Sequence, residues 1–192
     1  MQRKLLGGVA SLALIAALAA PVAAQAEPHW YIGGVKLVKK KNVKTEGGIT
    51  IGPIPGTTVT VSCKIRDAET LENPASGGAG VDIMKAFKVL SCGPNPCPVN
   101  SAGVQGALKV KALKLPWASK LVEVPPIADE FTGVELELFC KGTGTFAVIS
   151  GTLAPWVNPG FLEFTSGTGT LSGWNVVGND AFLPATTEAK NP

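Results

Sequence analysis

The sequence predicts an all-β domain: a single antiparallel β-sandwich or barrel, largely a meander, of about ten short strands. Three observations lead to this prediction. After residue 26 there is no long stretch with apolar residues at helical spacing. Short runs instead alternate between apolar and polar residues, which is the period of a strand with one buried face. Gly (23 residues) and Pro (15 residues) separate these runs, and such short connections favour antiparallel pairing because parallel strands need long crossovers.

The strands are expected where alternation is clearest and where turn residues flank it. In chain order the expected strands are Trp30–Val38, Gly48–Gly52, Thr57–Arg66, Val81–Ser91, Ala107–Leu113, Lys120–Val124, Gly133–Lys141, Thr145–Ala154, Phe161–Thr165, Gly169–Leu171 and Asn175–Phe182. Clusters such as Pro53-Ile54-Pro55-Gly56 and Asn158-Pro159-Gly160 are typical of turns, since Pro presets its own backbone angle and Gly accepts any.

The first 26 residues have the three-part layout of a secretory signal peptide. Arg3 and Lys4 supply the positive start, Leu5–Ala20 is apolar, and Ala24-Gln25-Ala26 is a cleavage pattern. The apolar run of about 16 residues is shorter than the roughly 20 of a spanning helix. We therefore expect cleavage before Glu27 and no transmembrane anchor afterwards. Residues 27–192 would then form one β domain with a frayed C-terminal tail, secreted or associated with a bacterial cell envelope.

The charge of the mature chain is close to balanced. The full chain has 17 basic and 14 acidic residues, and removing Arg3 and Lys4 leaves 15 against 14, a net charge of +1. Lysines gather in two places: Lys36, Lys39, Lys40, Lys41 and Lys44 in the first, and Lys109, Lys111 and Lys114 in the second. Because no aromatic residue is interleaved with either group, we expect solvated lysines and no nucleic-acid partner.

Four cysteines in an exported chain predict two disulfides, with three possible pairings. Cys92-Gly93-Pro94-Asn95-Pro96-Cys97 resembles a tight turn that brings its ends together, which favours Cys92–Cys97 and leaves Cys63–Cys140. Both Cys63 and Cys140 fall on the apolar side of an alternating run, so both should face the core. A four-thiolate zinc site is the alternative, but such sites usually have two close CxxC pairs.

No catalytic, cofactor-binding or metal-binding residue can be assigned from a motif. His29 is the only histidine and lies two residues inside the mature end, where a catalytic triad is not expected. There is no G-x-S-x-G motif, dinucleotide-binding motif or phosphate-binding loop.

Three sets of carboxylates remain for consideration. Asp129 and Glu130 are adjacent, so on a strand they point to opposite faces. Glu135 and Glu137 share the face opposite the core. The third set, Asp67, Glu69 and Glu72, is expected in a loop before Asn73-Pro74; a loop of this kind could bind calcium, but the EF-hand pattern is absent.

The candidate binding surface consists of His29, Trp30 and Tyr31. Consecutive residues on a strand face opposite sides, so one of the two aromatic rings should point away from the core. Gly33-Gly34 follows and would let a ligand approach the backbone closely. The alternative is that these aromatics close one end of the core, which is the commoner fate of a lone aromatic.

Several short segments occur in an order that resembles a group of small exported bacterial proteins with no assigned function. The segments are His29-Trp30-Tyr31-Ile32-Gly33-Gly34, Val61-Ser62-Cys63-Lys64, Asn73-Pro74, Gly78-Ala79-Gly80-Val81-Asp82, Ser91-Cys92, Pro96-Cys97-Pro98, Leu115-Pro116-Trp117 and Gly151-Thr152-Leu153. The group has Asn where this chain has Gly33. The resemblance implies an exported all-β protein and supplies no catalytic residues.

These observations favour a non-enzymatic binding or structural module of the cell envelope or extracellular space, whose partner is unknown and for which an envelope component is the candidate. The first alternative is a β-barrel that carries a small apolar ligand. The second is a carboxylate-dependent hydrolase. An exposed aromatic cluster would favour the module, an interior apolar cavity the carrier, and two carboxylates facing each other in a cleft the hydrolase.

Overall fold

The computed structural model describes residues 26–53, 58, 60–123, 126–166 and 168–192. The predicted signal peptide therefore lies, apart from its last residue, outside the described residues. The strands are β1 (His29–Ile32), β2 (Val35–Lys36), β3 (Lys41–Gly52), β4 (Val61–Glu72), β5 (Val81–Gly93), β6 (Ala107–Leu113), β7 (Trp117–Val122), β8 (Ala128–Lys141), β9 (Gly144–Leu153), β10 (Trp156–Asn158), β11 (Phe161–Phe164), β12 (Gly169–Leu171), β13 (Trp174–Leu183) and β14 (Thr187–Lys190).

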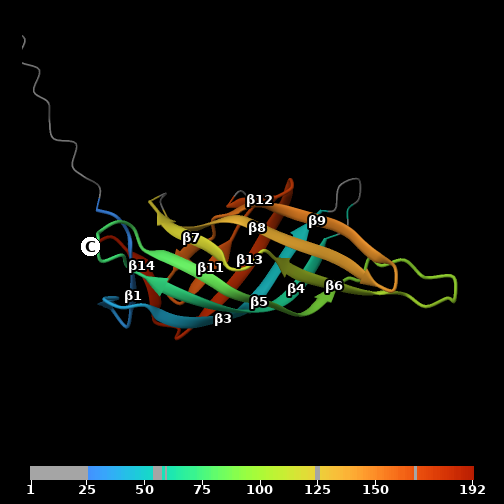
Figure 1. Cartoon of the computed structure of the whole chain (residues 1–192), viewed down its shortest axis with the longest axis horizontal. Coiled ribbons are helices and arrows are strands. Elements are labelled where there is room, and N and C mark those ends of the chain that lie inside the picture. Colours follow the sequence, from blue (N-terminus) through green and yellow to red (C-terminus); the bar gives the residue numbers. More distant parts are fainter. Residues whose placement is uncertain (1–25, 54–57, 59, 124–125, 167) are drawn as a thin grey trace, which may run out of the picture.

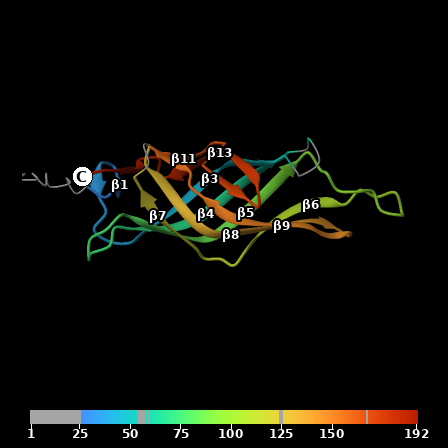
Figure 2. The ribbon, with the colours of Figure 1, turned by 90° about the horizontal axis from the view of Figure 1, so that it is seen from above.

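The chain forms an antiparallel closed barrel with eight strand positions (Figures 1 and 2). Around the barrel the order is β3, β4, β5, β7, β8, β9, β12 and β13, and β13 pairs with β3 to close the sheet. This is the order of the chain, so the expected all-β meander is confirmed. Closure leaves the barrel without a free edge along the β3–β13 seam, where nine residue pairs are in register from Lys44↔Leu183 to Gly52↔Asn175.

The described residues form fourteen strands, more than the expected ten or so, because three barrel positions each hold two short strands in line. Both β6 and β7 pair with β8, both β9 and β10 also pair with β8, and both β11 and β12 pair with β13. The interruptions fall at Lys114–Pro116, at Ala154-Pro155 and between Phe164 and Gly169. Proline cannot donate a ladder hydrogen bond, which explains the breaks at Pro116 and Pro155.

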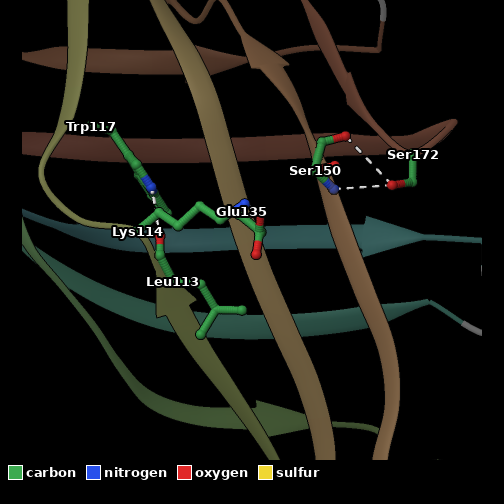
Figure 3. A network of polar contacts seen from close by, with 6 residues as sticks. All are labelled: Leu113, Lys114, Trp117, Glu135, Ser150 and Ser172. Carbon is green, nitrogen blue, oxygen red and sulfur yellow. Dashed lines mark hydrogen bonds and ion pairs between the residues drawn. The ribbon is translucent and has the colours of Figure 1, made fainter.

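Side chains bridge two of the places where strands end (Figure 3). At the break between β6 and β7, the Trp117 indole Nε1–H donates to the carbonyl of Leu113 at 2.9 Å. Lys114, whose φ is 55°, reaches across to Glu135 of β8, with 2.6 Å between Nζ and Oε2. Beyond β12, the Ser172 hydroxyl accepts from the backbone N–H of Ser150 on β9 at 3.0 Å. The sheet is thus held together where its backbone ladder is interrupted.

A three-stranded sheet, β14-β1-β2, covers one end of the barrel (Figure 1). Trp30 of β1 is fully buried and packs edge-on against Phe182 of β13, with 5.9 Å between ring centroids. The expected frayed C-terminal tail is wrong, because Thr187–Lys190 pairs with β1 in full register. The short alternation Thr187-Glu188-Ala189-Lys190 was too brief to predict a strand, and only its partner β1 makes it one.

Asn73 attaches this end sheet to the barrel. Its side-chain Oδ1 accepts from the Trp30 N–H at 2.8 Å, and its Nδ2 donates to the carbonyls of Trp30 at 2.9 Å and Leu37 at 3.0 Å. Gly80 allows this approach, because a Cβ there would lie 2.7 Å from the Trp30 ring and 2.9 Å from Asn73 Oδ1. The Asn73 amide therefore supplies the partner of the Trp30 N–H and a second donor to the Trp30 carbonyl, which also accepts from the Leu37 N–H.

The predicted disulfide pairing is wrong. The bridges are Cys63–Cys92 and Cys97–Cys140. Cys92 does not belong to the tight turn, because β5 runs on to Gly93 and places Cys92 directly opposite Cys63 on β4, with 4.0 Å between their Cα atoms. Cys97 is then left to reach Cys140 of β8 across a Cα–Cα distance of 5.6 Å. The prediction that Cys63 and Cys140 face the core is confirmed, since both are buried.

Both bridges lie at the barrel end opposite the β14-β1-β2 sheet, where the chain between β5 and β6 projects as a long loop (Figures 1 and 2). Asn95 Nδ2 donates to the carbonyl of Gly106 at 2.6 Å, and Gln105 Nε2 donates to that of Cys97 at 3.0 Å. Two disulfides are typical of a protein that works in an oxidising compartment.

We expect Asn73→Ala to destabilise the protein by about 3 kcal/mol, because three hydrogen bonds worth about 1 kcal/mol each are lost and the buried Trp30 N–H is left without a partner. Asn158→Ala is the matched control: Asn158 makes one side-chain bond, to Glu163 at 2.8 Å, and its loss should cost less than about 1 kcal/mol. Urea unfolding monitored by tryptophan fluorescence measures both. Equal losses would show that Asn73 does not hold the end sheet.

We expect the two disulfides to contribute almost equally to stability. Their sequence separations of 29 and 43 residues correspond to about 3.6 and about 4.0 kcal/mol in the loop-entropy model. Cys63→Ala/Cys92→Ala and Cys97→Ala/Cys140→Ala should therefore lower Tm by similar amounts, roughly 10 °C. Peptide mapping of the unreduced protein checks the pairing, and a peptide linking Cys92 to Cys97 would contradict it.

Candidate functional site

The predicted binding surface of His29, Trp30 and Tyr31 does not form as expected. Trp30 is 0% and Tyr31 9% exposed, so neither ring is available as an exposed platform. The two rings do face opposite sides of β1, but the outer side is covered as well: Lys190 of the neighbouring strand β14 lies over the Tyr31 ring, 4.6 Å from its centroid. His29 is half-buried beside them. The alternative, that these aromatics close the end of the core, describes their position.

Two of the other three tryptophans are also buried. Trp117 and Trp174 are buried in the core, whereas Trp156 on β10 is partly exposed. Trp156 borders an open depression on the outer wall, together with Glu130 of β8 and Thr168.

Five carboxyl groups lie inside the barrel, a feature that motif analysis missed. They are Asp67, Glu69, Asp82, Asp129 and Asp180, all buried. The expected loop around Asp67, Glu69 and Glu72 is wrong, because β4 continues to Glu72. The alternation that begins at Val61, Cys63 and Ile65 carries on through Asp67 and Glu69 to Leu71, so the two carboxylates point inward. Continuing the same alternation past Asp67 and Glu69 would have predicted that both side chains face the interior.

The prediction for Asp129 and Glu130 is confirmed, since Asp129 is buried and Glu130 reaches the outer surface. Strand register then gathers the buried acids into two groups. In the first, Asp67 of β4 and Asp180 of β13 face each other beside Thr45 of β3.

The second group spans β4, β5, β7 and β8. Ser119 is opposite Asp82 in the β5–β7 ladder and its hydroxyl donates a short hydrogen bond to Asp129. Asp82 lies between Asp129 and Glu69 and interacts with both.

These carboxyl groups hold their protons far above the ordinary range. Burial is the main cause that raises the pKa of Asp67 to about 9, and the charge of Asp180 is the second. Burial likewise raises the pKa of Glu69 and Asp129 well above their usual values, with the charge of Asp82 adding to both. Asp82 itself has a pKa of about 7, because burial raises it while hydrogen bonds from its neighbours stabilise its charge. Protonated Glu69 and Asp129 therefore donate to Asp82, and protonated Asp67 to Asp180.

The interior offers these groups no cation. All basic residues of the described chain are exposed, and within the described residues no three His, Cys, Asp or Glu side chains are grouped so that they could hold a metal ion. The nearest cavity is ≈ 20 Å³, lined by Asp67 and apolar side chains such as Met84 and Phe131. That is room for about one water molecule. The facing carboxylates are thus buried in the packed barrel, and Glu69 also borders an open depression beside Lys44 and Lys85.

Burial of five acids leaves the outer surface strongly basic. Of the 14 acidic residues in the described chain, nine reach the surface, whereas all 15 of its basic residues do, which gives a surface balance of +6 compared with +1 for all of these residues together. No helix in the described part of the chain is long and apolar enough to span a membrane.

The positive charge concentrates on the outer side of β3, β4 and β5. Its exposed basic residues are Lys44, Lys64, Arg66, Lys85 and Lys88, which we call the basic face. One exposed acid on these strands, Glu46, pairs with Arg66 at 2.9 Å. Arg66 lies directly opposite Lys88 in the β4–β5 ladder, an arrangement that is unfavourable for like charges. An open depression lies beside Lys44 and Lys85 and includes Asn42 and the small Ala68.

We expect the free energy of unfolding to fall as the pH rises from about 4 through 9. A carboxyl group whose pKa is raised on folding contributes fully below its ordinary pKa of 3.8, and the contribution is lost as the pH passes the folded values of about 7 for Asp82 and about 9 for Asp67. The slope approaches about 1.4 kcal/mol per pH unit for each retained proton. Urea unfolding at a series of pH values measures it.

Asp67→Asn supplies the matched test, because an amide donates to Asp180 as the protonated acid does and cannot ionise. Its stability should fall less steeply than wild type between pH 7 and 9, whereas Glu123→Gln, which removes one exposed carboxylate, should follow wild type. A stability that rises with pH in this range would contradict the protonated interior.

Comparison of the chain with models of protein families, with curated proteins and with solved structures found no match. The functional proposal therefore rests on the barrel's own geometry and charge.

Proposed function

We propose that this chain is an exported, non-enzymatic module of the bacterial cell envelope that binds an anionic envelope component through its basic face. The observation that carries the proposal is the segregation of charge: acids are buried in the interior and bases are displayed outside, with a surface balance of +6. The signal-peptide pattern of residues 1–26 and the two disulfides support export.

The basic face is suited to extended anionic partners. Its five cations come from three adjacent strands, so they lie on one wall of a closed barrel. Because Arg66 and Lys88 repel each other, an anion that bridges them would relieve an interaction that is unfavourable in the free protein. Lys44, Lys85 and the Asn42 amide border one depression, where they can donate to a phosphate or carboxylate group.

The interior gives less support to the two alternatives. A cavity of ≈ 20 Å³ is far smaller than the roughly 300 Å³ or more of a small-molecule site, so an apolar-ligand carrier would need a different, expanded interior. A hydrolase needs carboxylates that substrate can reach, and the facing carboxylates Asp82, Asp129 and Glu69 are buried.

We expect Lys85→Ser/Lys88→Ser to weaken binding of the mature protein to isolated envelope fractions by about 2 kcal/mol, since each basic residue near an anionic surface contributes about 1 kcal/mol. Lys109→Ser/Lys111→Ser on β6 is the matched control, with the same change of charge on another wall. Sedimentation with the fraction at low and high salt measures binding, which should fall with salt. Equal retention of the two variants, or binding insensitive to salt, would contradict the proposal.

A further inference from the structure

A second surface feature lies at the barrel end covered by the β14-β1-β2 sheet. It is the segment Val35–Lys41, with the sequence Val-Lys-Leu-Val-Lys-Lys-Lys, which we call the tip. Two of its apolar side chains are among the most exposed in the protein, Val35 at 69% and Val38 at 87%. Four of its seven residues are exposed lysines.

The local structure explains why both valines point outward. Gly33 and Gly34, with φ of 60° and 76°, form the tight turn that lets β2 fold back on β1, with Val35 opposite Ile32. Leu37 then turns inward and packs against the core, and its N–H donates to the Trp30 carbonyl at 3.0 Å. Leu37 thus anchors the tip, while Val35 and Val38 on either side of it are displayed to solvent.

The tip is positively charged even after its neighbours are counted. Lys40 pairs with Glu72 at 3.0 Å, and no ion pair links Lys36, Lys39 or Lys41 to an acid of the described chain. On the adjoining strand β14, Lys190 and Glu188 pair with each other at 2.9 Å. The tip also continues directly into β3, whose Lys44 belongs to the basic face.

We propose that the tip docks on an anionic phospholipid bilayer, with Val35 and Val38 entering the headgroup region and Lys36, Lys39 and Lys41 meeting lipid phosphates. Exposed apolar side chains flanked by lysines are the combination that a bilayer interface accepts, because apolar groups leave water while cations stay at the phosphates. A purely anionic polymer would engage the lysines and leave the valines without a partner.

This inference deepens the proposed function by naming a bilayer as the anionic component, with the basic face adding long-range attraction. The two can fail separately. The basic face would act on any polyanion, whereas the tip requires a surface that has an apolar layer beneath its charge. Substitutions that remove the valines and keep every lysine therefore isolate the tip.

The test is sedimentation of the mature protein with vesicles of phosphatidylglycerol mixed with phosphatidylcholine, of pure phosphatidylcholine, and with polyphosphate as an anionic polymer. Val35→Ser/Val38→Ser should weaken binding to the anionic vesicles about tenfold, since burying even part of two valines contributes at least about 1.4 kcal/mol. Binding to polyphosphate should not change. Lys39→Ser/Lys41→Ser should weaken vesicle binding by about fivefold for each lysine.

Val99→Ser/Val104→Ser is the matched control, because these valines are 60% and 61% exposed in the uncharged loop at the opposite end of the barrel. This variant should bind vesicles like wild type. Wild-type affinity of the Val35→Ser/Val38→Ser variant for anionic vesicles would overturn the tip proposal while leaving the basic face intact. Unchanged binding of the Lys39→Ser/Lys41→Ser variant to the anionic vesicles would overturn the electrostatic part of the tip proposal.

Discussion

Carboxyl groups buried without a cation can stay in a protein interior only if they share protons. Asp67 with Asp180, and Glu69 and Asp129 with Asp82, satisfy one another in this way, because each protonated member becomes a donor to its neighbour. Ionised carboxylates throughout this interior would repel one another, and the few fixed donors, such as the Ser119 hydroxyl at Asp129, are too few to satisfy them all. Water must therefore be kept away from these carboxyl groups, and the barrel must be closed around them. Because these acids are buried, they no longer offset the basic residues on the surface.

The β14-β1-β2 sheet keeps water away from the buried carboxyl groups. The carboxyl groups lie near the covered end of the barrel: Asp82 is opposite Leu71 in the β4–β5 ladder, and Phe182, which packs against Trp30, is opposite Thr45. The buried indole of Trp30 separates this polar layer from solvent on one side, and the apolar core closes it on the other. The Asn73 side chain matters beyond its own three hydrogen bonds, because it holds that indole in place.

Much of the fold could be predicted from residue patterns, while the pairings across strands could not. Alternation from Val61 to Ile65 and from Val134 to Cys140 identified two strands and placed Cys63 and Cys140 on inner faces. The disulfide partners depended on where β5 ends: the strand runs two residues past the expected end at Ser91, to Gly93, which places Cys92 in the ladder opposite Cys63. For Asp67 and Glu69, the polarity of the side chains suggested a loop although their positions in the alternating frame indicated the interior. The binding surface failed for a related reason: Lys190 of β14 lies over the Tyr31 ring, and the four residues of β14 are too short a pattern to recognise.

The two ends of the barrel are secured by different chemistry. Both covalent bridges sit at the end with the long loop, and the opposite end is closed by an indole, an amide and shared protons. Local opening at the two ends should therefore respond to unrelated solution variables: thiol reductants would loosen the β5–β6 loop, and hydroxide would loosen the β14-β1-β2 sheet. In amide hydrogen exchange, the protection of amides at one end of the barrel would therefore depend on thiol reductant, and the protection of amides at the other end would depend on pH.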